Sequence, residues 1–172
     1  MIRNRKLNRL KDYDYTRAGY YFVTVCVKDR IERFGDVKDG AMISNHWGGI
    51  VLDCWNDLPK HYSNLYLDEF VIMPNHVHGI MIIQNDEVGN GLKPFPTKNH
   101  GLSEFVRAFK TFSSRRINEG LNGKGRFQWQ KSFHDHIIRN EQDLTRIREY
   151  IVNNPLKWDE DVENKNQAKV AQ

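Results

Sequence analysis

Runs that contain β-branched and aromatic residues occur at four places along the chain, and the first of them, residues 20–27, is apolar on both faces. Such runs are typical of strands that lie inside a sheet. The dipeptide Pro74-Asn75 separates the two middle runs and is short enough to join them as a hairpin. The pattern therefore predicts strands at residues 20–27, 66–73, 76–83 and 133–138.

Three other segments carry apolar residues at the three- and four-residue spacing of an amphipathic helix. Pro59 follows the first of these segments and is expected to end it. Asn140 precedes the third segment and is suited to cap it, with Asp143 three residues later. The predicted helices span residues 45–58, 103–118 and 141–153.

The expected order is strand, helix, strand, strand, helix, strand, helix, with a hairpin rather than a crossover between the middle strands. This order favours an α+β fold of the ferredoxin-like kind, in which helices flank an antiparallel sheet of four to five strands. We expect a single domain at residues 1–158, which begins with a basic arm at residues 1–11. Residues 85–101 are interpreted as a loop. Residues 159–172, with four acids against two lysines, are interpreted as a charged, disordered tail.

The length of 172 residues suits one domain. No apolar run approaches the ~20 residues that a membrane-spanning helix needs, and no apolar segment follows the basic N-terminus as it would in a signal peptide. Cys26 and Cys54 are too few for a metal cluster and are typical of buried thiols in a reducing cytosol. Membrane proteins, disulfide scaffolds and zinc ribbons are therefore excluded, and a cytoplasmic location with no membrane partner is expected.

The net charge of +4 is unevenly distributed along the chain. Residues 1–18 hold six Lys or Arg against two acids, and residues 101–131 hold seven against two. Two basic segments on a small domain indicate a phosphate-bearing partner such as a nucleic acid. An ordinary solvated surface is the alternative interpretation.

His76 and His78 lie two residues apart on a predicted strand, so their side chains project from the same face. Two imidazoles on one face can converge on one divalent metal ion. The chain has seven histidines, so the pair can also arise by chance and serve packing. His134 and His136 form a second pair at the same spacing, for which a structural or DNA-contacting role of His136 is at least as reasonable.

Tyr150 and Asn154 lie four residues apart and are neighbours on one face of the last predicted helix. Tyr150 borders the apolar stripe of that helix, where a phenol can act as a nucleophile or can cover the core with its hydroxyl in water. Tyr13 and Tyr15 lie beside basic residues and can either stack on bases or pack on the core.

Taken together, these stretches resemble the single-tyrosine HUH transposases, in particular the REP-associated tyrosine transposases. The resemblance covers roughly residues 12–158 and rests most on Met-Pro-Asn-His-Val-His at residues 73–78 and Tyr-Ile-Val-Asn-Asn-Pro at residues 150–155. The stretches at residues 13–27 and 127–139 stand in the corresponding order along the chain.

The resemblance implies that His76 and His78 hold one Mg²⁺ or Mn²⁺, with Asn154 as a third ligand where many relatives have glutamine. It implies that Tyr150 is the nucleophile and that the substrate is single-stranded DNA with a folded hairpin. The DNA would be cut and rejoined through a 5′-phosphotyrosine, with the metal polarising the scissile phosphate. From helical spacing, Arg146 lies one turn before Tyr150 and is a candidate to stabilise the phenolate or the phosphate.

The basic segments would then contact the DNA and make binding salt-dependent. The candidate contacts are Arg3, Arg5, Lys6, Arg9, Tyr13, Tyr15, Lys110, Arg115, Arg116 and His136. Three alternatives remain open: a nicking enzyme that does not rejoin strands, a non-catalytic regulator that binds hairpin DNA or RNA, and a metal hydrolase without a covalent step. Relatives act as monomers or as dimers that exchange the tyrosine helix, and the sequence does not indicate which of these two states this chain adopts.

Overall fold

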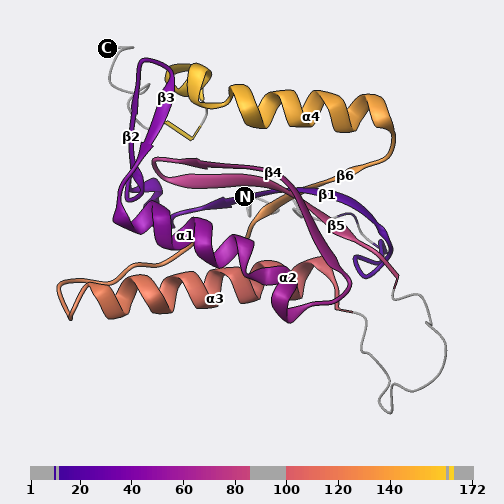
Figure 1. Cartoon of the computed structure of the whole chain (residues 1–172), viewed down its shortest axis with the longest axis horizontal. Coiled ribbons are helices and arrows are strands. Elements are labelled where there is room, and N and C mark those ends of the chain that lie inside the picture. The colour runs from indigo at the N-terminus through magenta and orange to yellow at the C-terminus, as the bar shows by residue number, and fades with distance from the viewer. Residues whose placement is uncertain (1–9, 11, 86–99, 162, 165–172) are drawn as a thin grey trace, which may run out of the picture.

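A central antiparallel sheet organises the chain, which the computed structural model describes at residues 10, 12–85, 100–161, 163 and 164 (Figure 1). The sheet has four strands in the order β4-β5-β1-β6. The bounds are Gly19–Cys26 for β1, Leu65–Met73 for β4, His76–Ile83 for β5 and His134–Ile138 for β6. The predicted α+β class and antiparallel sheet are confirmed.

Helices cover both faces of the sheet (Figure 1). On one face lie α1, His46–Asn56, α2, Leu58–His61, and α3, Leu102–Gly120; α4, Glu141–Asn153, lies on the other. We call these the α3 face and the α4 face. The short 3₁₀ helices η1, Lys28–Arg30, and η2, Pro155–Glu160, follow β1 and α4 along the chain.

β5 separates two cores because successive side chains of a strand point to opposite faces. Val77, Met81 and Ile83 belong to a large cluster on the α3 face. Ile80 belongs to a small cluster on the α4 face, which Ile138, Leu144, Ile147 and Ile151 complete. By the same alternation the two histidines of β5 share the α4 face with Ile80.

Gly79 allows the helices of the α3 face to approach the sheet closely. A Cβ at this position would lie 2.5 Å from the ring of Trp55 on α1. That ring stacks on Phe70 of β4 with 4.4 Å between centroids, and it meets Phe109 of α3 edge to face. Any larger residue at position 79 would therefore displace the tryptophan that joins α1 and α3 to the sheet.

α4 begins as the sequence predicts, and both apolar packing and hydrogen bonds attach it to the sheet. The side chain of Asn140 accepts a hydrogen bond from the backbone N–H of Asp143, which satisfies one of the free donors of the first turn. Below the helix, its apolar stripe packs on the small cluster. At its edge, the guanidinium of Arg148 forms two hydrogen bonds with the carboxylate of Asp68 on β4.

The hairpin of β2, Gly35–Lys38, and β3, Ala41–Ser44, is not predicted from the sequence pattern. Both strands are short, and their residues are exposed or half-buried, so they lack an apolar run. Their turn is Asp39-Gly40, with φ of 51° and 73°, as a tight two-residue hairpin turn requires. The Asp-Gly dipeptide is the sequence signal that identifies this hairpin.

Two boundary predictions are wrong. Pro59 does not end the first helix, because α1 ends at Asn56 and Pro59 lies in the first turn of α2, where its missing N–H costs nothing. The chain also remains structured beyond Trp158. η2 continues to Glu160, and the next described residues fold back against the end of the sheet.

Glu163 and Asn164 show why the tail is ordered there. Both are buried, and Asn164 donates a hydrogen bond to the carbonyl of Trp158. The carboxylate of Glu163 lies 2.7 Å from Nε of Arg30, and its carbonyl accepts a hydrogen bond from Asn75. The predicted disorder is therefore wrong for residues 159–161, 163 and 164, and the remainder of the predicted tail lies outside the described residues.

Three further predictions concern the cysteines, membrane-spanning helices and the loop at residues 85–101. Cys26 and Cys54 are buried, free thiols, as expected. Within the described residues, no helix combines the length and the apolar character that a membrane crossing demands. Most of the predicted loop at residues 85–101 lies outside the described residues.

Candidate active site and metal centre

His76 and His78 project from β5 toward α4 and are almost fully buried. Their Nε2 atoms lie 3.0 Å apart. Two unprotonated imidazole nitrogens at this distance repel each other, so either one nitrogen carries a proton or a cation lies between them. The pairing that the sequence predicts is therefore present in the folded chain.

Asn75 determines which nitrogen of His76 faces the site. Its Nδ2 donates to the carbonyls of Arg30 and Glu163, so its Oδ1 is the atom that lies 2.8 Å from Nδ1 of His76. An amide oxygen only accepts, so Nδ1 of His76 must carry the proton. Nε2 of His76 is left with a free lone pair that points into the site, as a metal ligand requires.

Thr24 holds the second ring in a similar way. It lies directly opposite His78 in the register of β1 and β5, with its Oγ1 2.8 Å from Nδ1 of that ring. Phe22, two residues earlier on the same face, stacks on the His78 ring with 5.3 Å between centroids. The Thr24 contact orients the ring through Nδ1, as the outer partners of metal-binding histidines do, and Phe22 packs against the face of the ring.

Asp161 is the third member of the cluster, and the sequence did not identify it. Its carboxylate Oδ2 lies 3.8 Å from Nε2 of His76, and its side chain is 6% exposed. One potential ligand atom from each of His76, His78 and Asp161 lies within 4.8 Å of the other two. Asp161 reaches the site because the segment after η2 folds back on the end of the sheet.

The protonation of the cluster suits a cation. Burial, together with the charge of Arg30, lowers the pKa of His76 to about 3. Burial and the neighbouring His76 lower the pKa of His78 well below its usual value. Both rings are therefore neutral at physiological pH, the form that binds metals. Two imidazoles suit transition ions such as Mn²⁺, and the carboxylate also suits Mg²⁺, so the donor set fits a divalent metal.

Tyr150 reaches the histidines from α4. Its Oη lies 3.3 Å from Nε2 of His78, and its ring meets the rings of His78 and Phe22 edge to face. The side chain remains 44% exposed, so the hydroxyl joins the buried cluster to solvent. Burial, followed by the charge of Asp161, raises the pKa of Tyr150, while the amide of Asn154 lowers it. The phenol therefore carries its proton at neutral pH.

Asn154, one turn beyond Tyr150, is buried to 2% exposure at the C-cap of α4. Its Oδ1 has no hydrogen-bond partner among the described residues. A buried carbonyl oxygen without a partner is costly, and a cation or a bound ligand would satisfy it. The role of Asn154 as a third ligand stays a prediction, and Asp161 is the oxygen donor that lies with the two histidines.

A pocket of about 510 Å³ opens beside Tyr150 on the α4 face. His136 of β6 lies in its wall, with Nε2 2.7 Å from Oδ2 of Asp143. Arg146 also lines the pocket, and its Nη2 lies 2.6 Å from the other oxygen of Asp143. The shared carboxylate therefore holds both side chains beside the tyrosine, and Lys157 adds a second permanent positive charge.

Tyr13 and Tyr15 pack against the protein core rather than projecting into solvent. Both are half-buried against the large core, with ring centroids 5.0 Å apart. The hydroxyl of Tyr13 lies 3.4 Å from that of Tyr21, and the hydroxyl of Tyr15 accepts a hydrogen bond from the backbone of Leu10. Arg3, Arg5, Lys6 and Arg9 lie outside the described residues.

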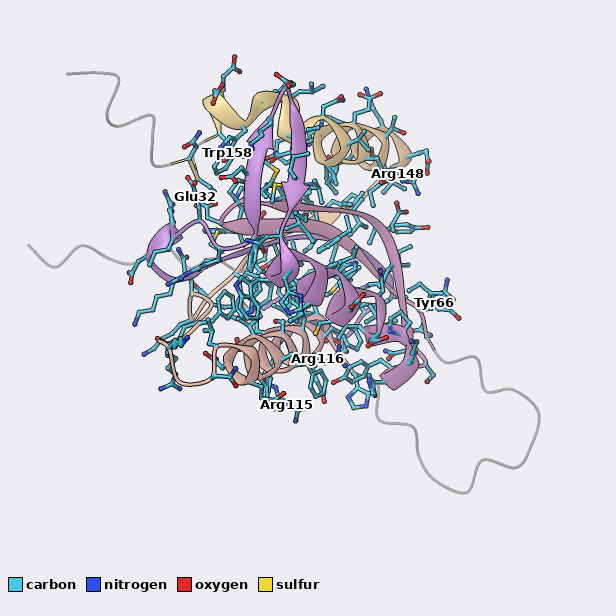
Figure 2. The ribbon with its side chains drawn as sticks, turned by 60° about the vertical axis from the view of Figure 1, so that its left-hand side comes forward. Glu32, Tyr66, Arg115, Arg116, Arg148 and Trp158 are labelled. Atoms are coloured by element: carbon cyan, nitrogen blue, oxygen red, sulfur yellow. The ribbon has the colours of Figure 1, made fainter. Side chains whose placement is uncertain are left out.

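The three basic candidates of α3 lie on the opposite face of the sheet from Tyr150. Nζ of Lys110 is half-buried and donates to the carbonyls of Gln130 and Lys131. Arg115 lies over the ring of Phe112, and Arg116 pairs with Asp57 at 3.4 Å. Figure 2 shows Arg115 and Arg116 projecting from α3, with the sheet between them and α4. The structure thus places His136 and Arg146 beside Tyr150, whereas the three basic candidates of α3 lie on the other face of the sheet.

Comparison with known proteins gives relatives of similar length. No protein-family profile matches the chain. An uncharacterized protein of Haemophilus influenzae is 36% identical over 172 residues, which covers 93% of each chain. A second protein of that organism, named "Putative REP-associated tyrosine transposase", is 24% identical over 150 residues, or 84% of this chain and 74% of its own.

A solved structure shares the fold. It is a REP-associated tyrosine transposase bound to a REP hairpin, with a TM-score of 0.60 and 20% sequence identity. The likeness covers 87% of this chain and 74% of the other. The two chains therefore share the arrangement of an antiparallel sheet with flanking helices.

Proposed function

We propose that this chain is a REP-associated tyrosine transposase, which cuts and rejoins single-stranded DNA beside hairpins. One observation carries the proposal: Oη of Tyr150 lies 3.3 Å from Nε2 of His78 although the two residues are 72 positions apart. A nucleophile candidate and a metal-ligand candidate from separate elements converge on one partly open site. A binding protein has no evident use for this arrangement.

The covalent step exchanges one phosphate ester for another. Oη of Tyr150 attacks the scissile phosphorus, the bond from phosphorus to the 3′ oxygen breaks, and the 5′ phosphate remains on the tyrosine. The phenol loses its proton and the departing 3′ oxygen takes one up, so charge is balanced. Because the phosphotyrosine keeps the energy of the phosphodiester, an incoming 3′ hydroxyl can reverse the step and join strands.

His76, His78 and Asp161 would hold one Mg²⁺ or Mn²⁺, and the unpartnered carbonyl oxygen of Asn154 is a candidate for a further ligand. A bound divalent ion polarises the scissile phosphate and offsets the negative charge that develops there. Tyr150 supplies the attacking oxygen at a fixed position, because α4 is packed on the sheet along its apolar stripe. A phosphate in the pocket beside it would meet the charge of Arg146.

The test compares Tyr150→Phe with Tyr66→Phe, which removes the hydroxyl of a similarly exposed tyrosine on β4. Each protein is incubated with a labelled DNA hairpin from the gene's own flanks, carrying an unpaired extension, in Mn²⁺ or in EDTA. We expect wild type and Tyr66→Phe to form an SDS-resistant protein–DNA adduct in Mn²⁺. No adduct is expected with Tyr150→Phe or in EDTA.

The other outcomes separate the alternatives. Metal-dependent cutting by Tyr150→Phe without an adduct would contradict the tyrosine mechanism and favour a metal hydrolase. Tight hairpin binding by wild type with no cutting under any metal would favour a non-catalytic regulator. Cutting with an adduct but without strand joining would define a nicking enzyme of the same chemistry.

A further inference from the structure

A second hollow lies on the α3 face, between α3 and the extended segment at residues 126–131. Its volume is about 580 Å³. Four basic side chains line it, namely Arg107, Lys110, Arg126 and Lys131, and its described lining includes no acidic side chain. We call this hollow the α3 groove. It is separate from the pocket at Tyr150, which opens on the other face of the sheet.

Hydrogen bonds hold the two walls of the α3 groove in place. Asn118 of α3 both donates to the carbonyl of Phe127 and accepts from its N–H. The indole of Trp129 donates to Ser113, and Lys110 donates to the carbonyls at positions 130 and 131. Lys110 is therefore a structural link as well as a charge. The groove is preorganised, so a ligand bound there orders little of the protein.

The outer cations of the α3 groove are available to a ligand. Arg126 and Lys131 are exposed, and neither has an acidic partner within the described part of the chain. Arg107 pairs with Glu104 at 3.7 Å, but its side chain is 76% exposed, and such pairs contribute little. A hollow with this charge and no acid in its lining attracts a polyanion.

The aromatic side chains of the α3 groove indicate which part of a nucleic acid it binds. Phe127, Trp129 and Phe133 line the groove, but all are buried in the core, so no ring face is free to stack on a base. Proteins that hold single strands rely on such exposed rings. Cations and polar side chains without ring faces suit sugar-phosphate backbone, which a duplex presents on its outside.

The position of the groove agrees with a role beside the proposed cutting site. β6 is an edge strand of the sheet, and the segment that forms one wall of the groove leads directly into it. On the other face of the same strand, His136 lines the pocket of Tyr150. A DNA molecule in the α3 groove can therefore reach the tyrosine by passing over the short β6 edge.

We propose that the α3 groove binds the phosphate backbone of the double-stranded stem of the hairpin, while the unpaired flank enters the pocket at Tyr150. This inference rests on the proposed function for its substrate. It assigns DNA contact to Arg107, Arg126 and Lys131, which differ from the α3 residues that the sequence singles out.

The test measures the affinity for a labelled hairpin over a range of salt concentrations. The variant is Arg126→Gln/Lys131→Gln, which removes two exposed charges but keeps most of the side-chain volume. Each lost phosphate contact should reduce the slope of log affinity against log salt by about 1, so we expect a decrease of about 2. A labelled unpaired strand of equal length should show no decrease.

Lys38→Gln/Lys124→Gln is the matched control, because it removes two exposed lysines outside the groove. It should keep the wild-type slope, and thermal unfolding should show that all three proteins are folded. An unchanged slope for the groove variant would overturn the proposal, and an equal decrease on the unpaired strand would overturn the assignment to the stem. The adduct assay on Tyr150 is independent, so a covalent adduct with an unchanged slope would refute the groove and leave the proposed function intact.

Discussion

The two faces of the sheet use the same strands for different purposes. The α3 face carries a continuous, mostly apolar core in which Trp55, Phe109 and Trp129 interlock. The α4 face carries a cluster of five buried aliphatic residues, and beside it lie the buried polar groups of the site. Burying unpaired polar groups is costly. The comparison indicates that the α3 face stabilises a sheet whose other face carries the buried polar groups of the candidate site.

The largest expected effect is a loss of stability from the α3 face. Phe109→Ala removes a fully buried ring between Trp55 and Trp129 and should lower the free energy of unfolding by about 3–5 kcal/mol. Leu144→Ala, in the small cluster below α4, should cost less, at the lower end of about 2–5 kcal/mol. Urea denaturation measures both values.

The rate of adduct formation per folded molecule should rank the two variants in the opposite order. Leu144 supports the helix that carries Tyr150, so Leu144→Ala should slow the reaction more than Phe109→Ala does. If Phe109→Ala slowed the reaction more, the separation of the two faces would be refuted.

The next effect tests the candidate metal centre without an activity assay. A ligand that binds only the folded state at 100 times its dissociation constant stabilises the protein by about 2.7 kcal/mol. Mn²⁺ should therefore raise the melting temperature of wild type by several degrees. The increase should vanish in His76→Ala/His78→Ala and weaken in Asp161→Asn.

His134→Ala/His136→Ala is the matched control for the metal experiment. These residues repeat the spacing of the first pair on another strand of the same sheet, but both are exposed and belong to no such three-residue cluster among the described residues. The control should keep the Mn²⁺ response of wild type. If only the control lost the Mn²⁺ response, the metal would bind His134 and His136, and its assignment to His76 and His78 would be wrong.

The smallest effect concerns the attachment of α4. The hydrogen bonds from Arg148 hold the pKa of Asp68 below its usual value. The pair therefore contributes stability above the unfolded pKa of about 4 and loses it as the pH falls through the lower folded value. Because Arg148 is 39% exposed, the contribution should be about 1 kcal/mol or less.

Urea midpoints at pH 7 and pH 3 measure this contribution. The difference between wild type and Asp68→Asn should shrink at the lower pH. Asp53→Asn, which changes an exposed carboxylate of α1, should give no such trend. A difference that stays constant with pH would show that the carboxylate charge of Asp68 does not fix α4.

The sequence predicts the parts of the site that local periodicity controls. Alternation along β5 places His76 and His78 on one face, and helical spacing places Asn154 one turn after Tyr150. That the strand and the helix face each other follows from the fold, which the antiparallel order and the family resemblance suggest. The distances then depend on packing, since Tyr150 approaches His78 only because the stripe of α4 lies on the small cluster.

Asp161 could not be predicted from local pattern. Its neighbourhood is acidic and polar, which in an isolated segment favours disorder. Order comes from partners far away in the sequence, because Asn75 and Arg30 fix Glu163 and thereby the chain around Asp161. Similarly, no pattern indicates that Lys110 is occupied by two carbonyls, since that depends on where residues 130 and 131 lie.

The contact of Asn75 with Glu163 also means that the site can be completed only late in synthesis of the chain. A ribosome makes the β5 histidines early, Tyr150 much later, and Asp161 and Glu163 after both. Until Glu163 emerges, one donor of the Asn75 amide lacks its partner and the carboxylate of Asp161 has nothing to hold it in place. A chain released at Trp158 would carry the tyrosine and both histidines but would lack Asp161, so its three-residue cluster would be incomplete.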